Sequence, residues 1–178
     1  MRGIAVRLLT LTMFSVVLAS APLFSVYAGG DPPPPPENAT TKGKKPGRSS
    51  SIEDPRSLAG YRTAYVAVYD RSDYAAAIDQ LKALGRDDAA PIANLIGYAY
   101  RKLGDYKVSQ IWYERALKAD PNHVKSWQYY GLWQVEQGNR ESARYHLNRI
   151  AALTGTGSEE YRSLSIALEK PPGTGLVY

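Results

Sequence analysis

Residues 93–100 read Ala-Asn-Leu-Ile-Gly-Tyr-Ala-Tyr, and residues 127–134, which lie 34 positions later, read Trp-Gln-Tyr-Tyr-Gly-Leu-Trp-Gln. Both stretches are apolar and aromatic, and both carry a glycine at the same place, Gly97 and Gly131. Other residues of similar type also recur 34 positions apart. These pairs are Gly104-Asp105 with Gly138-Asn139, Ser109 with Ala143, Tyr113 with Leu147, and Ala116 with Ile150. A period of this length indicates stacked supersecondary units.

The region from about Pro55 to Lys170 has a helical pattern. Apolar and aromatic residues recur three and four positions apart, which is typical of amphipathic helices. No alternating run persists between turn signals, so we expect no strand. The expected helix breaks are Gly85 to Asp88, Gly104-Asp105, Asp120-Pro121, Gly138-Asn139 and Gly155 to Ser158. These breaks predict helices of about 12 to 16 residues.

The unit from Pro91 to Asn122 resembles a tetratricopeptide repeat, with the pattern W-x2-L-G-x2-Y, then A-x3-F, then P. Its matching residues are Ile96, Gly97, Tyr100, Gly104-Asp105, Tyr113, Ala116 and Pro121. A second unit, about 124–156, supplies Trp127, Tyr130, Gly131, Ala143 and Leu147, but Gly155 replaces its closing proline. A degenerate unit at about 58–88 supplies Tyr61, Ala64, Val68, Asp73, Ala77 and Leu81, with Tyr65 in place of the glycine. The resemblance implies an all-α fold, a right-handed α-solenoid of about three antiparallel hairpins.

Several residue types have a mechanical reason within such hairpins. Gly97 and Gly131 are expected to let the two helices of a hairpin approach closely. Asp105 and Asn139 are expected to cap the second helices. Pro121 is expected to start the following helix, where its missing N–H costs nothing.

The last hairpin needs a cover, because a terminal repeat leaves one apolar face open. Residues 158–170 are expected to form this covering helix. Thr156 and Glu159 have the spacing of a capping box at its start. Its expected apolar face consists of Tyr161, Leu164 and Leu168.

The N-terminal 55 residues have a different composition from the helical region. Arg2 and Arg7 precede an apolar stretch from about Leu8 to Phe24. This pattern predicts that residues 1–28 are a signal peptide that is cleaved after Ala28. A cut after Ala21 is disfavoured by the proline that follows it, and an uncleaved membrane anchor is the alternative.

Residues 29–55 are predicted to be a disordered linker that is rich in proline and basic residues. The run Pro32 to Pro36 favours a polyproline II rod. We interpret this linker as a spacer, and a ligand for a proline-binding domain or a basic tether is the alternative. The folded domain is then 56–170, followed by a flexible tail at 171–178.

The composition excludes several classes of chemistry. The chain has no cysteine, so disulfides, thiol catalysis and zinc–thiolate sites are excluded. His123 and His146 have no second ligand at metal spacing, and we expect both to be structural or exposed. We therefore expect no catalytic residue, no cofactor and no metal, and predict that the chain is not an enzyme. The net charge of +5, nearer +3 without Arg2 and Arg7, does not favour nucleic-acid binding.

The resemblance also implies a binding surface, since the first helices of such hairpins line a concave groove that takes an extended peptide or a partner helix. Register places the following partner-binding candidates there: Arg62, Val66, Tyr69, Asn94, Tyr98, Arg101, Lys125, Gln128 and Leu132. This basic and aromatic set would suit an acidic peptide or one that ends in a carboxylate.

The function that we expect is therefore a non-enzymatic protein-binding scaffold or adaptor of the cell envelope. The signal predicts an exported protein, periplasmic if the source is a Gram-negative bacterium, or else anchored in the inner membrane by an uncleaved N-terminal segment. Apart from that segment we expect no membrane contact. The alternatives are a structural subunit or assembly factor of an envelope complex, and an accessory domain to an enzyme in another chain.

Overall fold

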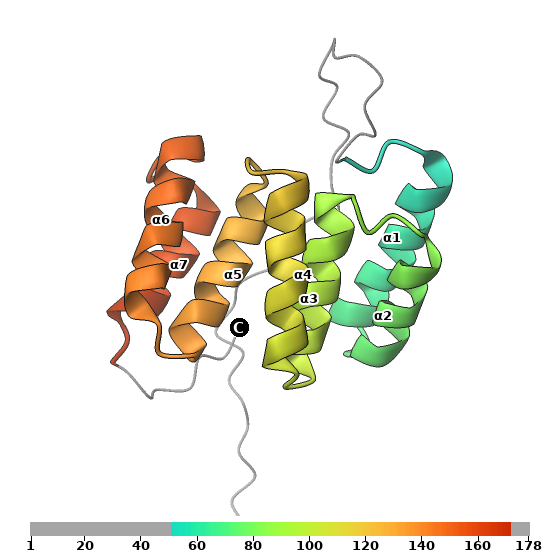
Figure 1. Cartoon of the computed structure of the whole chain (residues 1–178), viewed down its shortest axis with the longest axis horizontal. Helices are drawn as coiled ribbons and strands as arrows, with labels where there is room; N and C mark the ends of the chain where they lie inside the picture. The colour runs from blue at the N-terminus through green and yellow to red at the C-terminus, as the bar shows by residue number, and fades with distance from the viewer. Residues whose placement is uncertain (1–50, 172–178) are drawn as a thin grey trace, which may run out of the picture.

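The computed structural model describes residues 51–171, which form seven α-helices and no strand (Figure 1). The helices are α1 (Pro55–Tyr69), α2 (Tyr74–Ala83), α3 (Ala90–Lys102), α4 (Tyr106–Ala119), α5 (Val124–Glu136), α6 (Arg140–Thr154) and α7 (Glu159–Glu169). Successive helices pair into three hairpins that stand side by side, and α7 packs against both helices of the last hairpin. The prediction of an all-α helical-repeat fold is confirmed.

Two helices are shorter than the predicted 12 to 16 residues: α2, the second helix of the first hairpin, has 10 residues, and α7 has 11. A turn from Asp70 to Asp73, which the predicted breaks did not include, separates α1 from α2. Ser72 in this turn has a φ of 53°, in the left-handed region that few non-glycine residues adopt.

Aspartates cap three of the helices. The Asp105 carboxylate accepts a hydrogen bond from the backbone N–H of Val108 at 3.2 Å, as predicted for the start of α4. Asp73 does the same at the start of α2. Asn139 stands at the N-cap of α6 without a side-chain cap bond, and its amide N–H donates to the side-chain oxygen of Gln134 at 3.0 Å.

The expected role of Pro121 is wrong. Helix α5 begins at Val124, with His123 as its N-cap residue. Pro121 lies in the preceding turn. This turn is closed by a hydrogen bond from the His123 backbone N–H to the Asp120 carbonyl oxygen. The Pro121 carbonyl there accepts a hydrogen bond from the Trp127 indole at 2.8 Å.

Close helix packing within the hairpins depends on the two predicted glycines. A Cβ atom at Gly97 would lie 2.9 Å from Cδ1 of Tyr113 on α4. The Ser109 hydroxyl also donates a hydrogen bond to the Gly97 carbonyl at 2.7 Å. At Gly131, a Cβ atom would collide with Leu164 of α7, so this glycine admits the covering helix as well as α6.

Helix α7 covers the last hairpin, as predicted. Leu164 is fully buried, and Ala167 is 1% exposed. The Arg140 guanidinium donates to the carbonyl oxygens of Leu168 and Lys170 and so holds the end of α7.

The expected capping box of α7 is wrong. The N-cap residue is Ser158, whose hydroxyl accepts from the Tyr161 backbone N–H at 3.3 Å. Thr156 lies two residues further back, outside the helix start.

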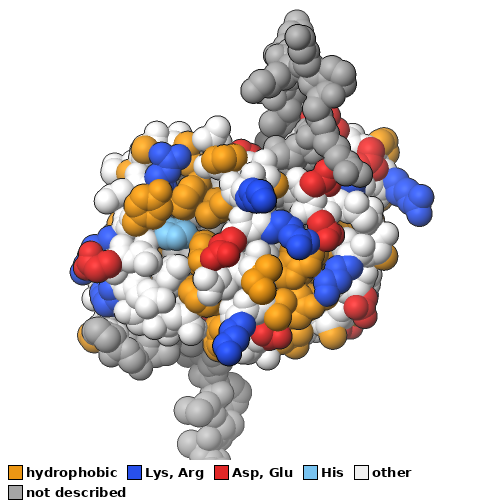
Figure 2. Space-filling model, in the orientation of Figure 1, with side chains coloured by type: hydrophobic (Ala, Val, Ile, Leu, Met, Phe, Trp, Pro, Cys, Tyr) orange, Lys and Arg blue, Asp and Glu red, His pale blue; other side chains and the backbone are white. Residues whose placement is uncertain are grey.

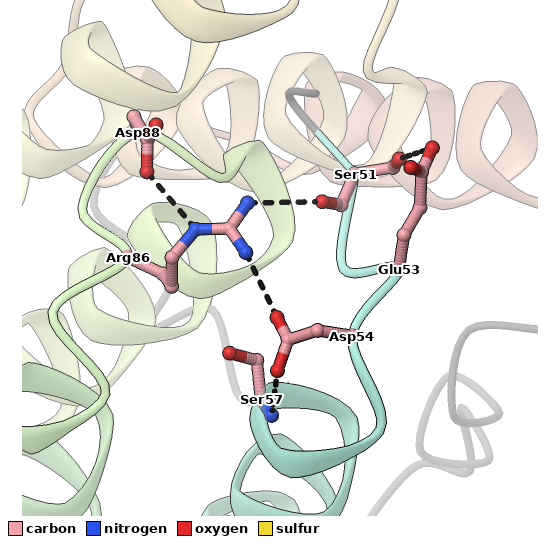
Figure 3. Close-up of polar contacts among 6 residues, drawn as sticks. All are labelled: Ser51, Glu53, Asp54, Ser57, Arg86 and Asp88. Atoms are coloured by element: carbon pink, nitrogen blue, oxygen red, sulfur yellow. Dashed lines mark hydrogen bonds and ion pairs between the residues drawn. The ribbon is translucent and has the colours of Figure 1, made fainter. Parts of the chain in front are cut away.

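Arg86 joins the segment before α1 to the loop between α2 and α3 (Figure 3). Its guanidinium pairs with Asp54 at 2.9 Å and with Asp88 at 3.3 Å, and it donates to the Ser51 carbonyl. Asp54 is also the N-cap of α1 and accepts from the Ser57 backbone N–H at 2.7 Å. Hydrogen bonds from Ser57 lower the pKa of Asp54, and the positive charge of Arg86 lowers it further by a smaller amount.

The folded part therefore begins before residue 56. Ile52 is 8% exposed and belongs to the core cluster. Ile52 of the predicted linker thus packs against the helices as an apolar side chain that the linker interpretation overlooked, and Pro55 is the first residue of α1. The predicted signal peptide, the proline run and residues 172–178 of the tail lie outside the described residues.

Candidate partner-binding surface

The predicted binding residues all lie on the first helices of the three hairpins. Arg62, Val66 and Tyr69 belong to α1, Asn94, Tyr98 and Arg101 to α3, and Lys125, Gln128 and Leu132 to α5. Because α3 packs against both α1 and α5, these helices form one continuous layer. We call this side of the molecule, defined by the nine residues, the inner face.

Arg101 is committed to a contact inside the fold. Its guanidinium makes two hydrogen bonds to the carboxylate of Glu136 on α5, at 2.7 and 2.8 Å. Only 3% of its side chain is exposed. Burial would lower the pKa of Arg101, but the Glu136 hydrogen bonds outweigh it and raise the pKa. Arg101 therefore joins two hairpins and does not present a charge to a ligand.

Lys125 is similarly engaged. Its ammonium group lies 2.9 Å from a carboxylate oxygen of Glu160 on α7. Although burial opposes the effect, the hydrogen bond from Lys125 lowers the pKa of Glu160. The pair attaches the covering helix to α5, so Arg101 and Lys125, both predicted to bind a partner, each already pair with a carboxylate inside the fold.

Three further predicted residues are buried. Leu132 is 1% exposed and is part of the core, while Asn94 and Gln128 are 4% and 6% exposed. The side-chain oxygens of Asn94 and Gln128 have no hydrogen-bond partner among residues 51–171. Unpaired buried amide oxygens are uncommon, since each forfeits the hydrogen bonds that it made with water.

Five tyrosines pack together beneath the inner face: four of them are buried, at 5–8% exposure, and only Tyr69 is partly exposed. The ring of Tyr69 stacks on Tyr98 with centroids 5.5 Å apart, and Tyr98 lies 5.2 Å from Tyr129. Tyr65 approaches Tyr69 to 4.4 Å, and Tyr61 continues the series along α1 at 6.3 Å from Tyr65. We call these five residues the inner tyrosine cluster.

The cluster holds its hydroxyl groups protonated. Burial raises the pKa of Tyr65 to about 12, and it raises those of Tyr69 and Tyr129 well above the usual value. The hydroxyls of Tyr69 and Tyr129 lie 2.9 Å apart and share a hydrogen bond. The Tyr65 hydroxyl is buried and has no hydrogen-bond partner among the described residues.

Sequence reasoning did not group three of these residues with the inner face. The repeat pattern assigns Tyr61 and Tyr65 to the hairpin core, where both are indeed buried, and Tyr129 lies one position after Gln128. The signal that could have found them is the four-residue spacing of Tyr61, Tyr65 and Tyr69, which places all three on one side of a helix.

The accessible part of the inner face lies on α1 and at the end of α3. Arg62 is exposed, and Val66 is 36% exposed. Lys102 is exposed at the end of α3, and its ammonium group lies 6.0 Å from the centroid of the Tyr98 ring. Basic charge and apolar surface therefore occur together here. Of the three predicted cations Arg62, Arg101 and Lys125, only Arg62 is exposed.

The opposite side of the molecule, formed by the second helices, carries a different surface. Ile111 on α4 and Tyr145 on α6 occupy equivalent repeat positions and are 55% and 58% exposed. Nearby, the Arg115 guanidinium lies over the Trp112 ring at 4.4 Å. Figure 2 shows hydrophobic side chains gathered on this face, with Lys and Arg side chains among them.

Both histidines make contacts within the fold: Nδ1 of His123 lies 2.7 Å from the Ser126 hydroxyl, and Nδ1 of His146 lies 3.2 Å from the Trp127 carbonyl oxygen. Burial lowers the pKa of both His123 and His146 to about 4. His146 packs between Trp127 and Tyr130, with ring centroids 5.1 and 4.8 Å away. Within residues 51–171, no group of three or more His, Asp or Glu residues is placed to hold a metal ion. In the same range, no helix is both long enough and apolar enough to cross a membrane.

Comparison with known families agrees with this geometry. The tetratricopeptide repeat family model matches residues 90–123, which span α3, α4 and the turn after them. Residues 90–123 are therefore a tetratricopeptide repeat, a unit that generally serves as a protein-interaction scaffold and is typically not catalytic. No curated protein matches the chain.

Proposed function

We propose that this chain is a non-enzymatic adaptor of the cell envelope that binds an extended peptide or helix of a partner protein on its inner face. The observation that carries the proposal is the juxtaposition of exposed basic groups, Arg62 and Lys102, with the exposed Val66 and the partly exposed Tyr69, which lies at the edge of the inner tyrosine cluster. Tyrosine offers a large apolar ring together with a polar hydroxyl, a combination that is enriched in protein interfaces.

The charge of this surface favours an acidic partner. Helix α1 carries Arg56 and Arg62 and no acidic residue, and α3 ends in Arg101-Lys102. Because the charge of Arg101 is compensated by Glu136, the attraction rests on Arg62 and Lys102 at the edge of the layer. Such rim charges mainly increase the association rate and the salt dependence of binding.

The envelope location is a separate part of the proposal. It depends on the apolar segment and cleavage pattern of residues 1–28, which lie outside the described residues. Fractionation of the source cell, with the size of the mature chain as readout, tests this part independently of the binding surface.

The test of the binding surface is affinity capture from the envelope fraction with the Arg62→Glu/Lys102→Glu variant. We expect this variant to lose most of the partner that the unchanged chain retains. The matched control is Lys107→Glu, which reverses an exposed charge on α4 and should leave capture unchanged. Equal capture by all three chains would contradict binding at the inner face.

A second candidate function is supported by the exposed pair on the second helices. Ile111 and Tyr145 stand at equivalent repeat positions, so an assembly factor or structural subunit could dock across α4 and α6. In that case Ile111→Ser/Tyr145→Ser, and not the charge reversal on the inner face, would abolish capture. If the chain is an accessory domain to an enzyme in another chain, the captured partner should carry the enzymatic activity. Catalytic turnover by the purified chain alone would contradict the non-enzymatic proposal.

A further inference from the structure

We propose that helix α7 binds α7 of a second copy of this chain, so that two molecules pair antiparallel through their covering helices. The contact uses the side of α7 formed by Tyr161, Ser165 and Leu168, which we call the open side. Helix α7 lies at the end of the row of hairpins, beside α6 (Figure 1). The inference therefore goes beyond the proposed function and does not depend on it.

Helix α7 continues the 34-residue repeat. An aromatic residue, a large residue and a small residue recur in α7 in the order and spacing that they have in α5. These pairs are Trp127 with Tyr161, Tyr130 with Leu164, and Gly131 with Ser165. Helix α7 also packs against both α5 and α6, just as α5 packs against both α3 and α4. In sequence and in packing, α7 is thus the first helix of a further hairpin.

In the three complete hairpins, a second helix covers the side of the first helix that corresponds to the open side. Gly97 marks this side of α3, because a Cβ atom there would lie 2.9 Å from the Tyr113 ring of α4. Ser165 stands two repeats after Gly97. The part of the chain that the structure describes contains no helix after α7, and all three residues of the open side are partly exposed. The repeat array therefore ends in a helix that lacks its usual neighbour.

The open side is complementary to itself when two α7 helices run antiparallel. With Ser165 of both copies at the crossing point, Tyr161 of one copy meets Leu168 of the other, because these residues lie four positions before and three after Ser165. The small serine lets the helices approach closely, as Gly97 does between α3 and α4. A contact of this kind uses the same patch on both molecules, as two-fold symmetry requires.

Two exposed charges beside the open side favour a second copy over a helix of unrelated sequence. Arg162 and Glu169 lie seven positions apart, so they occupy the same edge of the helix. Antiparallel pairing brings Arg162 of each copy close to Glu169 of the other, which gives two ion pairs. Within the described residues neither side chain forms an ion pair. The charges are thus available for this contact.

The contact is small, so the dimer is expected to be weak. Helix α7 has 11 residues and is about 16 Å long, at about 1.5 Å per residue. Interfaces that bury less than about 1,200 Å² in total are typical of transient complexes. We therefore expect a dissociation constant on the order of tens of micromolar.

The most direct test uses the absence of cysteine from the chain. Ser165→Cys places one thiol of each copy at the crossing point, where a disulfide is within reach. We expect mild oxidation to convert this variant into a covalent dimer, measured by non-reducing electrophoresis. The matched control is Ser142→Cys, exposed on α6, which should give severalfold less dimer. Equal yields from the two variants would overturn the pairing.

An exchange of charges tests the antiparallel register. Sedimentation velocity over a concentration series should show that Arg162→Glu weakens the dimer severalfold, because acidic residues then face each other. The double variant Arg162→Glu/Glu169→Arg should restore the dimer, which a misfolded helix would not do. Failure of the double variant to recover would refute the antiparallel register.

The inference and the proposed function fail separately. Ser165→Glu should abolish the dimer and leave partner capture intact, whereas Arg62→Glu/Lys102→Glu should lose capture and keep the dimer. An unchanged chain that is monomeric at every concentration overturns the pairing of two copies. If Ser165→Glu then also loses capture, the open side binds a helix of the partner instead.

Discussion

Gly97 shows how one missing side chain sets the distance between two helices. An alanine there would bring its Cβ within 2.9 Å of the Tyr113 ring and 3.3 Å of the Ser109 carbonyl oxygen. We therefore expect Gly97→Ala to lower the free energy of unfolding by about 1–3 kcal/mol, although alanine favours the helix intrinsically. Urea denaturation of the purified chain measures this.

The matched control is Gly157→Ala. A Cβ atom on Gly157 would have no neighbour within 4 Å, and the φ of this glycine is not positive. Its replacement should therefore change stability by less than about 0.5 kcal/mol. A Gly97→Ala chain as stable as this control would show that α3 and α4 can separate without cost.

His146 predicts a dependence of stability on pH. Burial lowers its pKa from 6.5 to about 4, so the folded state keeps the imidazole neutral where the unfolded chain takes up a proton. The free energy of unfolding should therefore fall as the pH drops from about 6.5 to about 4, by about 3 kcal/mol for a shift of this size. His123 adds a similar contribution.

Replacement of His146 by Phe removes one of these two titrations. Unfolding curves at several pH values should show the fall reduced by about half, whatever the variant's stability at neutral pH. An unchanged pH dependence in His146→Phe would mean that the folded chain accommodates the charged imidazole.

The ion pairs of two predicted binding residues are also a matter of individual side chains. Helical register correctly placed Arg101 and Lys125 on first helices, but register does not reveal what each side chain pairs with. Glu136, the partner of Arg101, lies 35 residues away in sequence, and Glu160 reaches Lys125 from the covering helix. Only the packing of the hairpins brings these charges together.

At the scale of the element, the start of α7 tests which residue caps a helix. Ser158 accepts the Tyr161 backbone N–H, so Ser158→Ala should cost about 1 kcal/mol of stability. Thr156→Ala should cost much less, because Thr156 lies outside the helix. Thermal denaturation of both variants decides between them, and a larger loss for Thr156→Ala would restore the capping-box interpretation.

The buried ion pair between α3 and α5 predicts a larger effect. Glu136→Gln leaves the Arg101 guanidinium buried without a counter-charge, and such losses cost about 3–5 kcal/mol. The control is Arg144→Gln, which removes an exposed pair with Glu141 on α6 and should cost less than about 0.5 kcal/mol. Equal stability of the two variants in urea would contradict a role for Arg101 in joining the hairpins.

The sequence allowed most of the helices to be predicted, because the repeat at 34 residues supplies both the period and the turn positions. The turn at Asp70 to Asp73 was missed, since it lacks the glycine that marks the later hairpins. The start of the folded part was missed because Ile52 is a single apolar residue in a polar stretch. Arg86, which lies beyond α2, contacts Ser51 and Asp54 on either side of Ile52, and the sequence gives no sign of these contacts.

At the scale of the molecule, three hairpins and a covering helix create two faces of different character. The inner face combines tyrosines with Arg62 and Lys102, and the opposite face carries Ile111 and Tyr145. Register placed basic and aromatic residues on the first helices, but it did not reveal that Arg101 and Lys125 are paired within the fold. It could not anticipate how tightly the tyrosines pack on one another, because that depends on the spacing between the helices.

The central claim is that a protein partner binds the inner face, and site-specific photo-crosslinking in the source cell tests it most directly. A photoreactive phenylalanine analogue is placed at Val66 on the inner face or at Ile111 on the opposite face, both exposed positions. The account predicts a discrete crosslinked partner from Val66 and none from Ile111. Adducts from Ile111 alone would contradict it.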